Sequence, residues 1–264
     1  MELGEKVFVV TGAGSGMGRQ LTIELVRRGA RVAAVDMRAA TLDETKALTG
    51  SDVATFVLDV TDADAVAALP ERVINALGAV DGLINNAGII QPFLKLDQLT
   101  VADIERVMAV NFTAPLNLIR AFLPHLKSRP EAHILNVASM GAYAPVPGQS
   151  LYGASKAALA QLSEGLRSEL LSTNIRVITA YPGAINTNIA TNSGIAVSES
   201  SAANSAIKTT DANLAAQLMI DALERGRERV FIGSDARMLN LLARVNPKFA
   251  AWLIYRNMRS LLGE

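Results

Sequence analysis

The sequence predicts an α/β fold in which helices cover both faces of a largely parallel sheet. Short, almost continuously apolar runs rich in β-branched residues alternate with longer segments whose apolar residues recur every three or four positions. Strands that are buried on both faces have such apolar runs, and they occur in parallel sheets covered by helices. Regular alternation of the two patterns is typical of a doubly wound sheet with right-handed crossovers.

Seven segments have the composition of buried strands. They are residues 7–10, 32–35, 55–58, 82–84, 133–137, 176–180 and 230–232. The segments between them have helical spacing, as in Leu159, Leu162 and Leu166. We expect a single domain over residues 1–264, because no repeat or linker interrupts the alternation.

Composition excludes several classes of function. Half of the residues are hydrophobic, and 25 Lys and Arg balance 25 Asp and Glu, so a sizeable core is expected and a nucleic-acid partner is not. The chain has no cysteine, which rules out disulfides and thiolate chemistry, and the isolated His125 and His133 suggest no metal site. Since neither a signal peptide nor an apolar stretch of about 18 residues is visible, we expect a cytoplasmic protein without a transmembrane segment.

A glycine-rich turn follows the first predicted strand directly and precedes a helix. It reads TGAGSGMG from Thr11 to Gly18. A turn without side chains lets the backbone approach a pyrophosphate, and the amino end of the next helix attracts the anion. No Lys-Ser/Thr pair follows, so the turn does not resemble a nucleoside triphosphate loop. The alternative is a turn that is merely flexible.

Asp36 ends the second predicted strand, 24 residues after Gly12. A carboxylate at this place can accept hydrogen bonds from both hydroxyls of the adenosine ribose and repels a 2′-phosphate, which favours NAD over NADP. Met37 offers no countercharge, whereas Arg38 could turn toward a phosphate. The alternative role of Asp36 is to cap the end of its strand.

Tyr152 and Lys156 lie four residues apart near the start of a predicted helix, so their side chains share one face. A neighbouring ammonium lowers the pKa of a phenol, which is about 10 in isolation, and makes it a usable general acid and base. Alone, this spacing is common on solvated helices. Here the ends of neighbouring strands add Ser139, the 85–88 segment and the 182–183 segment, and parallel sheets bind ligands at that edge.

These motifs together resemble the classical short-chain dehydrogenase/reductase family over about residues 5–235. The matching pieces, in the family's order, are Thr11-Gly12-x-x-x-Gly16-x-Gly18, Asp59-Val60, Asn85-Asn86-Ala87-Gly88, Asn111, Ser139, Tyr152-x-x-x-Lys156 and Pro182-Gly183-x-x-x-Thr187. The resemblance implies a Rossmann-type fold with a seven-stranded, mostly parallel sheet in the order 3-2-1-4-5-6-7 and helices on both faces.

The resemblance also implies catalytic roles. Tyr152 would exchange a proton with the substrate oxygen, and Ser139 would stabilise charge on that oxygen. Lys156 would bind the nicotinamide ribose and lower the Tyr152 pKa. Asn111, inside a long helix predicted over 101–127, would anchor a water that links Lys156 to solvent, a role compatible with ordinary bonding to backbone.

Cofactor and substrate contacts follow from the same resemblance. Ile185 and Thr187 would hold the carboxamide, Asp59 and Val60 the adenine, and Asn86 the ribose. The implied NAD contacts are Gly12, Ser15, Gly16, Met17, Gly18, Asp36, Asp59, Val60, Asn86, Ala87, Gly88, Tyr152, Lys156, Pro182, Gly183, Ile185 and Thr187. The implied substrate contacts are Ser139, Tyr143, Tyr152 and Gly183, and the uncharged 141–147 segment suggests an apolar substrate.

Two segments depart from the regular pattern. Residues 191–210 are rich in Ser, Ala and Asn with little periodicity, and we interpret 188–210 as a substrate lid or a partly disordered loop. Residues 236–262 form an amphipathic tail that is broken at Asn246-Pro247. Its apolar positions predict packing on the core or on another subunit of a homodimer or homotetramer, with a pocket cover or peripheral membrane contact as alternatives. They are Leu241, Leu242, Val245, Phe249, Trp252 and Leu253.

The sequence thus predicts an NAD-dependent oxidoreductase that interconverts a secondary alcohol and a ketone, as an alcohol dehydrogenase or carbonyl reductase. Two other functions remain open. A non-catalytic NAD sensor would not need Ser139, Tyr152 and Lys156 together. A sugar-nucleotide epimerase or dehydratase usually has a larger carboxyl-terminal substrate domain than the residues after Thr187 provide.

Overall fold

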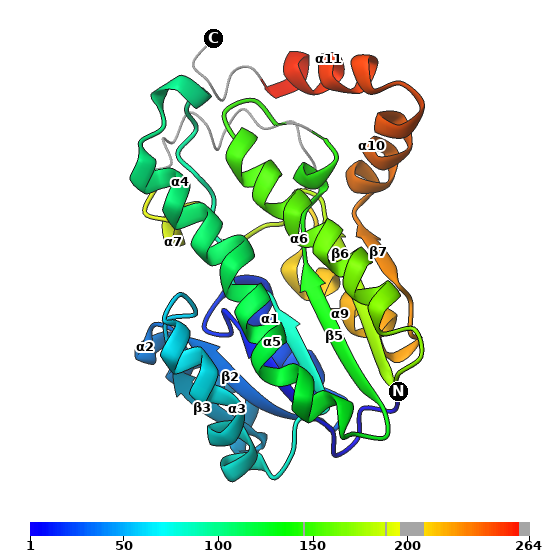
Figure 1. The fold of residues 1–264 in the computed structure, drawn as a ribbon. Helices are drawn as coiled ribbons and strands as arrows, with labels where there is room; N and C mark the ends of the chain where they lie inside the picture. The colour runs from blue at the N-terminus through cyan, green and yellow to red at the C-terminus, as the bar shows by residue number, and fades with distance from the viewer. Residues whose placement is uncertain (145, 188, 196–208, 259–264) are drawn as a thin grey trace.

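Seven parallel strands form the central sheet, in the order β3-β2-β1-β4-β5-β6-β7 (Figure 1). The computed structural model describes residues 1–144, 146–187, 189–195 and 209–258. The strands are β1 Val7–Thr11, β2 Arg31–Asp36, β3 Val53–Val57, β4 Gly82–Asn85, β5 Ala132–Val137, β6 Ile175–Pro182 and β7 Arg229–Ile232. The predicted fold class and strand order are confirmed, and every pair of neighbouring strands is parallel.

The third strand begins two residues earlier and ends one residue earlier than the sequence pattern predicts. It was expected at 55–58, whereas β3 begins at Val53 and ends at Val57. β3 is an edge strand in which only Val53 and Phe56 are buried, while Val57 is 54% exposed. An edge strand lacks the continuous apolar run that marks the central strands, which explains the displaced boundary.

Helices cover both faces of the sheet and close two separate apolar cores. Alternate residues of β1 point to opposite faces, so Phe8 and Val10 join one core while Val7 and Val9 join the other. On the first face lie α1 Gly16–Arg27, α2 Ala39–Thr49 and α9 Ala212–Glu224. On the second lie α3 Ala63–Leu77, α5 Ala114–Lys127 and α6 Ser150–Glu169.

The long helix predicted over 101–127 is present and contains a π-helical turn. α4 Val101–Met108 continues through the wide turn Ala109–Thr113 into α5. Such turns often occur at functional sites, and this one carries Asn111. By length and mean hydropathy (1.2), this is the one helix among the described residues that could cross a membrane. Of its most apolar window, 39% is buried, and a core helix of a soluble protein meets the same criteria of length and hydropathy.

The carboxyl-terminal tail forms two helices, α10 Ser234–Val245 and α11 Pro247–Met258, with the break where it was predicted. The prediction that the apolar tail residues pack on the core is wrong for four of the six positions. Their side chains are 45% to 76% exposed, and they are Leu241, Val245, Phe249 and Trp252. The side that packs inward carries Ala236, Leu239, Ala250 and Ile254 instead. Ala236 and Ala250 have small side chains, and Leu239 and Ile254 pack on Ala144 in the body of the molecule.

The predicted lid over 188–210 lies mostly outside the described residues. The structure describes only 189–195 and 209–210 of it, including the short helix α7 Ile189–Asn192. Thr210 forms an isolated parallel bridge with Ile185, which ties the end of this segment to the loop after β6.

Candidate active site

A cavity of about 400 Å³ opens at the carboxyl ends of β1, β2 and β4. Most predicted cofactor residues line it, namely Gly12, Ser15, Gly16, Met17, Asp36, Asp59, Val60, Asn86, Ala87, Gly88 and Thr187. Met37, Arg38, Leu58, Ile89, Val110, Ile189 and Asn192 complete its wall. The remaining predicted cofactor residues do not line this cavity: Gly18, Tyr152, Lys156, Pro182, Gly183 and Ile185.

The glycine turn packs closely enough against its surroundings to exclude side chains. Gly12 has a φ of +65°, and a methyl group in its place would lie 3.0 Å from Nδ2 of Asn86. A methyl group at Gly18 would lie 2.0 Å from the Gly12 carbonyl oxygen, far inside van der Waals contact. Ser15 then begins α1, whose amino end faces the cavity. This arrangement suits an anionic group such as a pyrophosphate.

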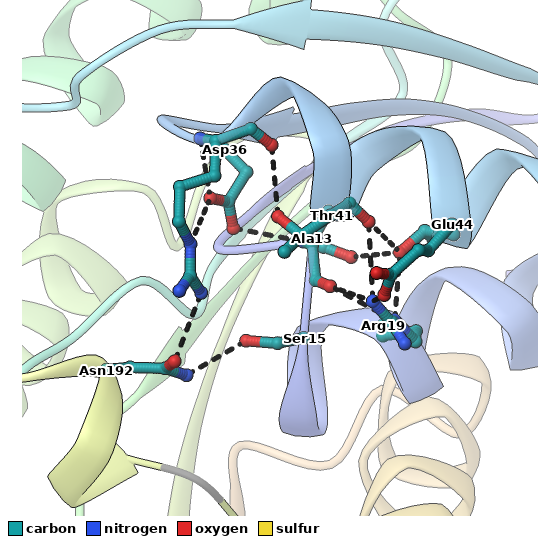
Figure 2. Close-up of polar contacts among 10 residues, drawn as sticks. Ala13, Ser15, Arg19, Asp36, Thr41, Glu44 and Asn192 are labelled. Carbon is teal, nitrogen blue, oxygen red and sulfur yellow. Dashed lines mark hydrogen bonds and ion pairs between the residues drawn. The ribbon is translucent and has the colours of Figure 1, made fainter.

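Asp36 is held at the cavity wall by backbone groups (Figure 2). Its carboxylate accepts hydrogen bonds from the amides of Gly14 at 3.0 Å and Arg38 at 3.1 Å. The Arg38 guanidinium donates to Oδ1 of Asn192, and the Asn192 amide donates to Oγ of Ser15. A polar chain therefore joins β2, α7 and the glycine turn around one end of the cavity.

Asn86 lies on the cavity wall and carries a side-chain acceptor without a partner. Its Nδ2 donates to the Thr11 carbonyl at 2.9 Å, which fixes the side chain across the turn. Its Oδ1 is buried and has no hydrogen-bond partner. A buried acceptor without a partner is costly, so this oxygen is suited to a ligand that donates there, such as a ribose hydroxyl. Together with the glycine cradle and Asp36, it fits an adenine dinucleotide.

Ser139 and Tyr152 are brought together at the carboxyl end of β5. Ser139 begins the short turn after the strand and accepts the Gly141 amide at 3.1 Å, while Tyr152 lies in the first turn of α6. Burial raises the pKa of the Tyr152 phenol, and its hydrogen bond with Ser139 opposes that shift. Gln91 accepts the Tyr152 amide at 2.9 Å and so positions the start of α6.

Lys156 lies deeper than Tyr152 and has a different partner from the one expected. Its ammonium donates to the Val137 carbonyl at 2.9 Å, and burial lowers its pKa to about 8. The pKa of Tyr152 responds to burial and to Ser139.

Asn111 lies beside Lys156, and three hydrogen bonds hold its side chain. Its Nδ2 donates to the Ile89 carbonyl and to Oγ of Ser155, and its Oδ1 accepts the Ile89 amide at 2.9 Å. A methyl group in place of a Gly88 hydrogen would lie 3.0 Å from Nζ of Lys156 and 3.3 Å from Oδ1 of Asn111. The two side chains thus meet at Gly88, on the cavity wall.

Comparison with known proteins decides the family. A family model described as short chain dehydrogenase matches residues 6–197. The chain belongs to the short-chain dehydrogenase family. SadH of Mycobacterium tuberculosis is 34% identical over 250 residues, covering 91% of this chain and 90% of that protein. The 1-deoxy-11-beta-hydroxypentalenate dehydrogenase of Streptomyces avermitilis is 34% identical, covering 90% and 88%.

A solved structure supports the same assignment. A short chain dehydrogenase from Burkholderia cenocepacia in complex with NADP has a TM-score of 0.82 and 29% identity, covering 96% of this chain and 99% of that one. This short-chain dehydrogenase is therefore an oxidoreductase that acts on CH–OH groups with a nicotinamide dinucleotide, as its family does.

Two predicted substrate residues of this short-chain dehydrogenase have other contacts. The Tyr143 hydroxyl donates to the Ala236 carbonyl at 2.8 Å, and its ring packs on Tyr181 and Phe231. The Gly183 amide donates to the Ile232 carbonyl, as a continuation of the sheet. The structure therefore places Tyr143 and Gly183 against β7 and α10 rather than on the cofactor cavity.

Asp235 is a site residue that sequence reasoning missed. Its Oδ2 accepts the Ala184 amide at 2.8 Å, and a methyl group at Gly183 would lie 2.2 Å from Oδ1. Asp235 therefore fixes the loop that leads from β6 to Thr187 on the cavity wall. Since 51 residues separate the carboxylate from its partner, no local pattern could have indicated the contact. The same holds for the bond between Asn192 and Ser15.

Proposed function

We propose that this short-chain dehydrogenase interconverts a secondary alcohol and a ketone on an apolar substrate, with NAD as its preferred cofactor. The observation that carries the proposal is the hydrogen-bonded pair of Ser139 and Tyr152 at the carboxyl end of β5. A hydroxyl and a phenol that point to one place can hold a single substrate oxygen between them. Lys156 and Asn111 lie behind this pair, next to the cofactor cavity.

Tyr152 moves the proton in this proposal. Burial favours the neutral phenol, which during reduction gives its proton to the ketone oxygen while a hydride reaches the carbonyl carbon. During oxidation the phenolate accepts the hydroxyl proton of the substrate while a hydride leaves the same carbinol carbon. The bound nicotinamide supplies the hydride acceptor or donor. Ser139 donates a hydrogen bond to the reacting oxygen and stabilises the charge that develops there.

Lys156 and Asn111 support the transfer. The Lys156 pKa of about 8 lies close to neutral pH, which suits a group that exchanges protons while it holds ribose hydroxyls. Asn111 keeps the Ile89 backbone and Ser155 in fixed positions around the ammonium. Its position next to Gly88 and Lys156 supports the role of anchoring a water on the path to solvent.

The preference for NAD rests on Asp36. Its carboxylate is 8% exposed, is fixed by two backbone amides and lines the cavity, where it would repel a 2′-phosphate. Arg38 lies 4.0 Å from that carboxylate and is bonded to Asn192, so its charge is engaged on both sides. The Burkholderia cenocepacia relative holds NADP, so the preference needs its own test.

An apolar substrate is supported by the surroundings of Ser139. The described residues of the 140–147 segment include no charged side chain, and Met140, Tyr143 and Ala144 pack on the apolar inner side of the tail helices. One relative is named as a dehydrogenase of a hydroxypentalenate, which supports a hydroxyl-bearing carbon as the reacting group.

The decisive experiment measures NADH and NADPH turnover with a panel of ketones and secondary alcohols. Wild type is compared with Tyr152→Phe and with Tyr255→Phe, an exposed control on α11. We expect Tyr152→Phe to lose roughly 10²- to 10⁴-fold in kcat, as for other general acids and bases. Full activity of Tyr152→Phe would refute the proton-transfer role, and NAD binding without turnover of any substrate would indicate a sensor.

A second measurement tests the cofactor preference. We expect kcat/KM to be at least tenfold higher with NAD than with NADP, since a like charge at the phosphate position costs more than about 1.4 kcal/mol. Asp36→Ala should reduce this ratio, whereas the exposed Asp64→Ala should leave it unchanged. Equal use of both cofactors by wild type would contradict the role of Asp36.

A further inference from the structure

The two tail helices expose a row of large apolar side chains, which we call the tail face. Its residues are Met238, Leu241 and Val245 on α10, which are 56%, 65% and 76% exposed, and Phe249 and Trp252 on α11, which are 45% and 49% exposed. Scattered apolar residues are normal on a protein surface, but a contiguous group marks a contact surface.

The spacing of these residues places them on one side of each helix. Met238, Leu241 and Val245 follow at intervals of three and four, and Phe249 and Trp252 are three apart. The buried residues of the same helices fall on the other side of each helix, and they are Ala236, Leu239, Ala250 and Ile254. The tail helices therefore have one side toward the body of the molecule and a second apolar side toward solvent.

Cations border the tail face, and no acidic residue occurs between 236 and 258. The basic residues are Arg237, Arg244, Lys248 and Arg256. In the part of the chain that the structure describes, none of the four is ion-paired with a carboxylate. Asp235, the acid that directly precedes this stretch in the sequence, accepts the Ala184 amide.

The aromatic residues of the tail face are preorganised. Phe249 and Trp252 stack with ring centroids 5.6 Å apart, and the Arg256 guanidinium lies 5.4 Å above the Trp252 ring. Aromatic rings next to arginine and lysine are typical of helices that lie at the boundary between lipid headgroups and acyl chains.

We propose that the tail face docks on an anionic lipid surface. Apolar side chains flanked by unpaired cations, with no acid along 23 residues, are complementary to an apolar layer beneath negative headgroups. A second copy of this chain would bring the same cations against its own, because a two-fold interface pairs a patch with itself. Charge complementarity thus favours lipid over self-association.

The tail face lies close to the substrate side of the site. α10 follows β7 at the carboxyl end of the sheet, and Leu239 and Ile254 pack on Met140, Tyr143 and Ala144, just after Ser139 (Figure 1). If the proposed function holds, docking would bring the site to the membrane in which an apolar substrate dissolves. Docking itself does not depend on that function.

Trp252 makes the proposal directly measurable, since it is the only tryptophan in the chain. The full protein, without cofactor or substrate, is titrated with vesicles of phosphatidylcholine and with vesicles of phosphatidylcholine and phosphatidylglycerol in equal parts. We expect a blue shift of Trp252 fluorescence with the anionic vesicles and quenching by brominated acyl chains. Since no turnover is measured, failure here is independent of failure of the proposed function.

Variants separate the apolar and electrostatic contributions. Phe249→Ser keeps the reporter and should weaken binding, whereas Leu171→Ser, at a 75% exposed position outside the tail, should not. Replacing Arg237, Arg244 and Lys248 by Gln should weaken binding to anionic vesicles roughly a hundredfold, because each cation near such a surface contributes about a factor of five. The wild-type shift should also fall as salt increases.

Three results would overturn the proposal. The first is a Trp252 spectrum unchanged by anionic vesicles. The second is equal binding to zwitterionic vesicles, which would remove the role of the cations. The third is a spectral shift that depends on protein concentration without vesicles and is lost in Phe249→Ser, which would identify the tail face as an interface between copies of the chain.

Discussion

The cofactor side and the substrate side of this site both lie at the carboxyl ends of the strands, but different contacts hold them in place. On the cofactor side, Gly12, Gly14 and Asp36 are fixed by close backbone packing and by bonds between neighbouring strands and turns. On the substrate side, Tyr143 and the loop after β6 depend on bonds to the tail, at Ala236 and Asp235. The glycine turn and Asp36 thus depend on contacts within the sheet, whereas Tyr143 and the loop that carries Thr187 depend on contacts with the last helices.

This difference implies that residues on one side of the site can vary in sequence without a change in the residues on the other side. Variation in the tail can reshape the substrate pocket while the glycine turn and Asp36 stay unchanged. Loops and terminal segments on a rigid scaffold commonly supply specificity in this way. The predictions below test the separation by changing residues on each side and at their boundary.

The largest effect is expected at Lys156, on the boundary. Lys156→Met should lower kcat/KM roughly a thousandfold, since it removes the proposed ribose contact and the proposed proton path. The same variant should be more stable at neutral pH. Burial that lowers the Lys156 pKa to about 8 costs about 3 kcal/mol, only part of which the bond to Val137 offsets.

The pH dependence of that stability gain has a definite sign. Below pH 8 the folded and unfolded states both carry the charge, so the full penalty is present. Above pH 8 the folded lysine loses its proton first, and the penalty disappears as the pH approaches the unfolded value of 10.5. The free energy of unfolding is measured by chemical denaturation between neutral pH and the unfolded lysine pKa. Wild type is compared with Lys156→Met and with the exposed control Lys46→Met. A variant less stable than wild type at pH 7 would contradict the burial argument.

Gly18→Ala should be the next largest change and should act on the cofactor side. The added methyl would lie 2.0 Å from the Gly12 carbonyl oxygen, so the turn must move. We expect NAD affinity to fall roughly a hundredfold and the free energy of unfolding to fall by about 2 kcal/mol. Calorimetric NAD titration and thermal denaturation measure the two effects. Gly165→Ala, with nothing within 4 Å of the added methyl, is the matched control in α6. Unchanged NAD affinity of Gly18→Ala would count against the turn as a pyrophosphate site.

Asp235→Ala should have a smaller effect that reaches the cofactor through the loop after β6. The Ala184 amide loses its acceptor, so Thr187 is held less firmly on the cavity wall. We expect the KM for NAD to rise about tenfold with a smaller change in kcat, which corresponds to the loss of one hydrogen bond to a charged group. Asp235→Asn keeps an acceptor oxygen and should recover most of the loss. Equal defects in both variants would indicate that the charge, not the bond, is required.

Tyr143→Phe should have the smallest effect and should be confined to the substrate side. It removes the hydroxyl bond to Ala236 and should lower the free energy of unfolding by about 1 kcal/mol. Burial raises the Tyr143 pKa, so this phenol stays neutral and takes no part in proton transfer. NAD affinity should not change, and the KM for substrate should change only a few-fold. A loss of kcat comparable to that of Tyr152→Phe would overturn this separation.

The sequence by itself determined the alternation of strands and helices, the glycine turn, Asp36 and the spacing of Tyr152 and Lys156. These features are local, because apolar runs, steric limits on glycine turns and the pitch of a helix act over a few residues. Sequence placed the edge strand β3 less well, since only two of its five residues are buried and no continuous apolar run marks it.

Only the tertiary structure decided which atoms meet. Lys156 bonds to Val137 and not to Tyr152, Asp235 holds Ala184, and the tail turns Ala236 and Leu239 inward while Leu241 and Trp252 stay exposed. Both sides of each tail helix carry apolar residues, so hydropathy could not tell which side packs. Which side chains become buried and which groups form hydrogen bonds depends on contacts between segments that are distant in the chain. The free energy of these contacts is determined by the packing of the whole molecule, so no local sequence pattern indicates them.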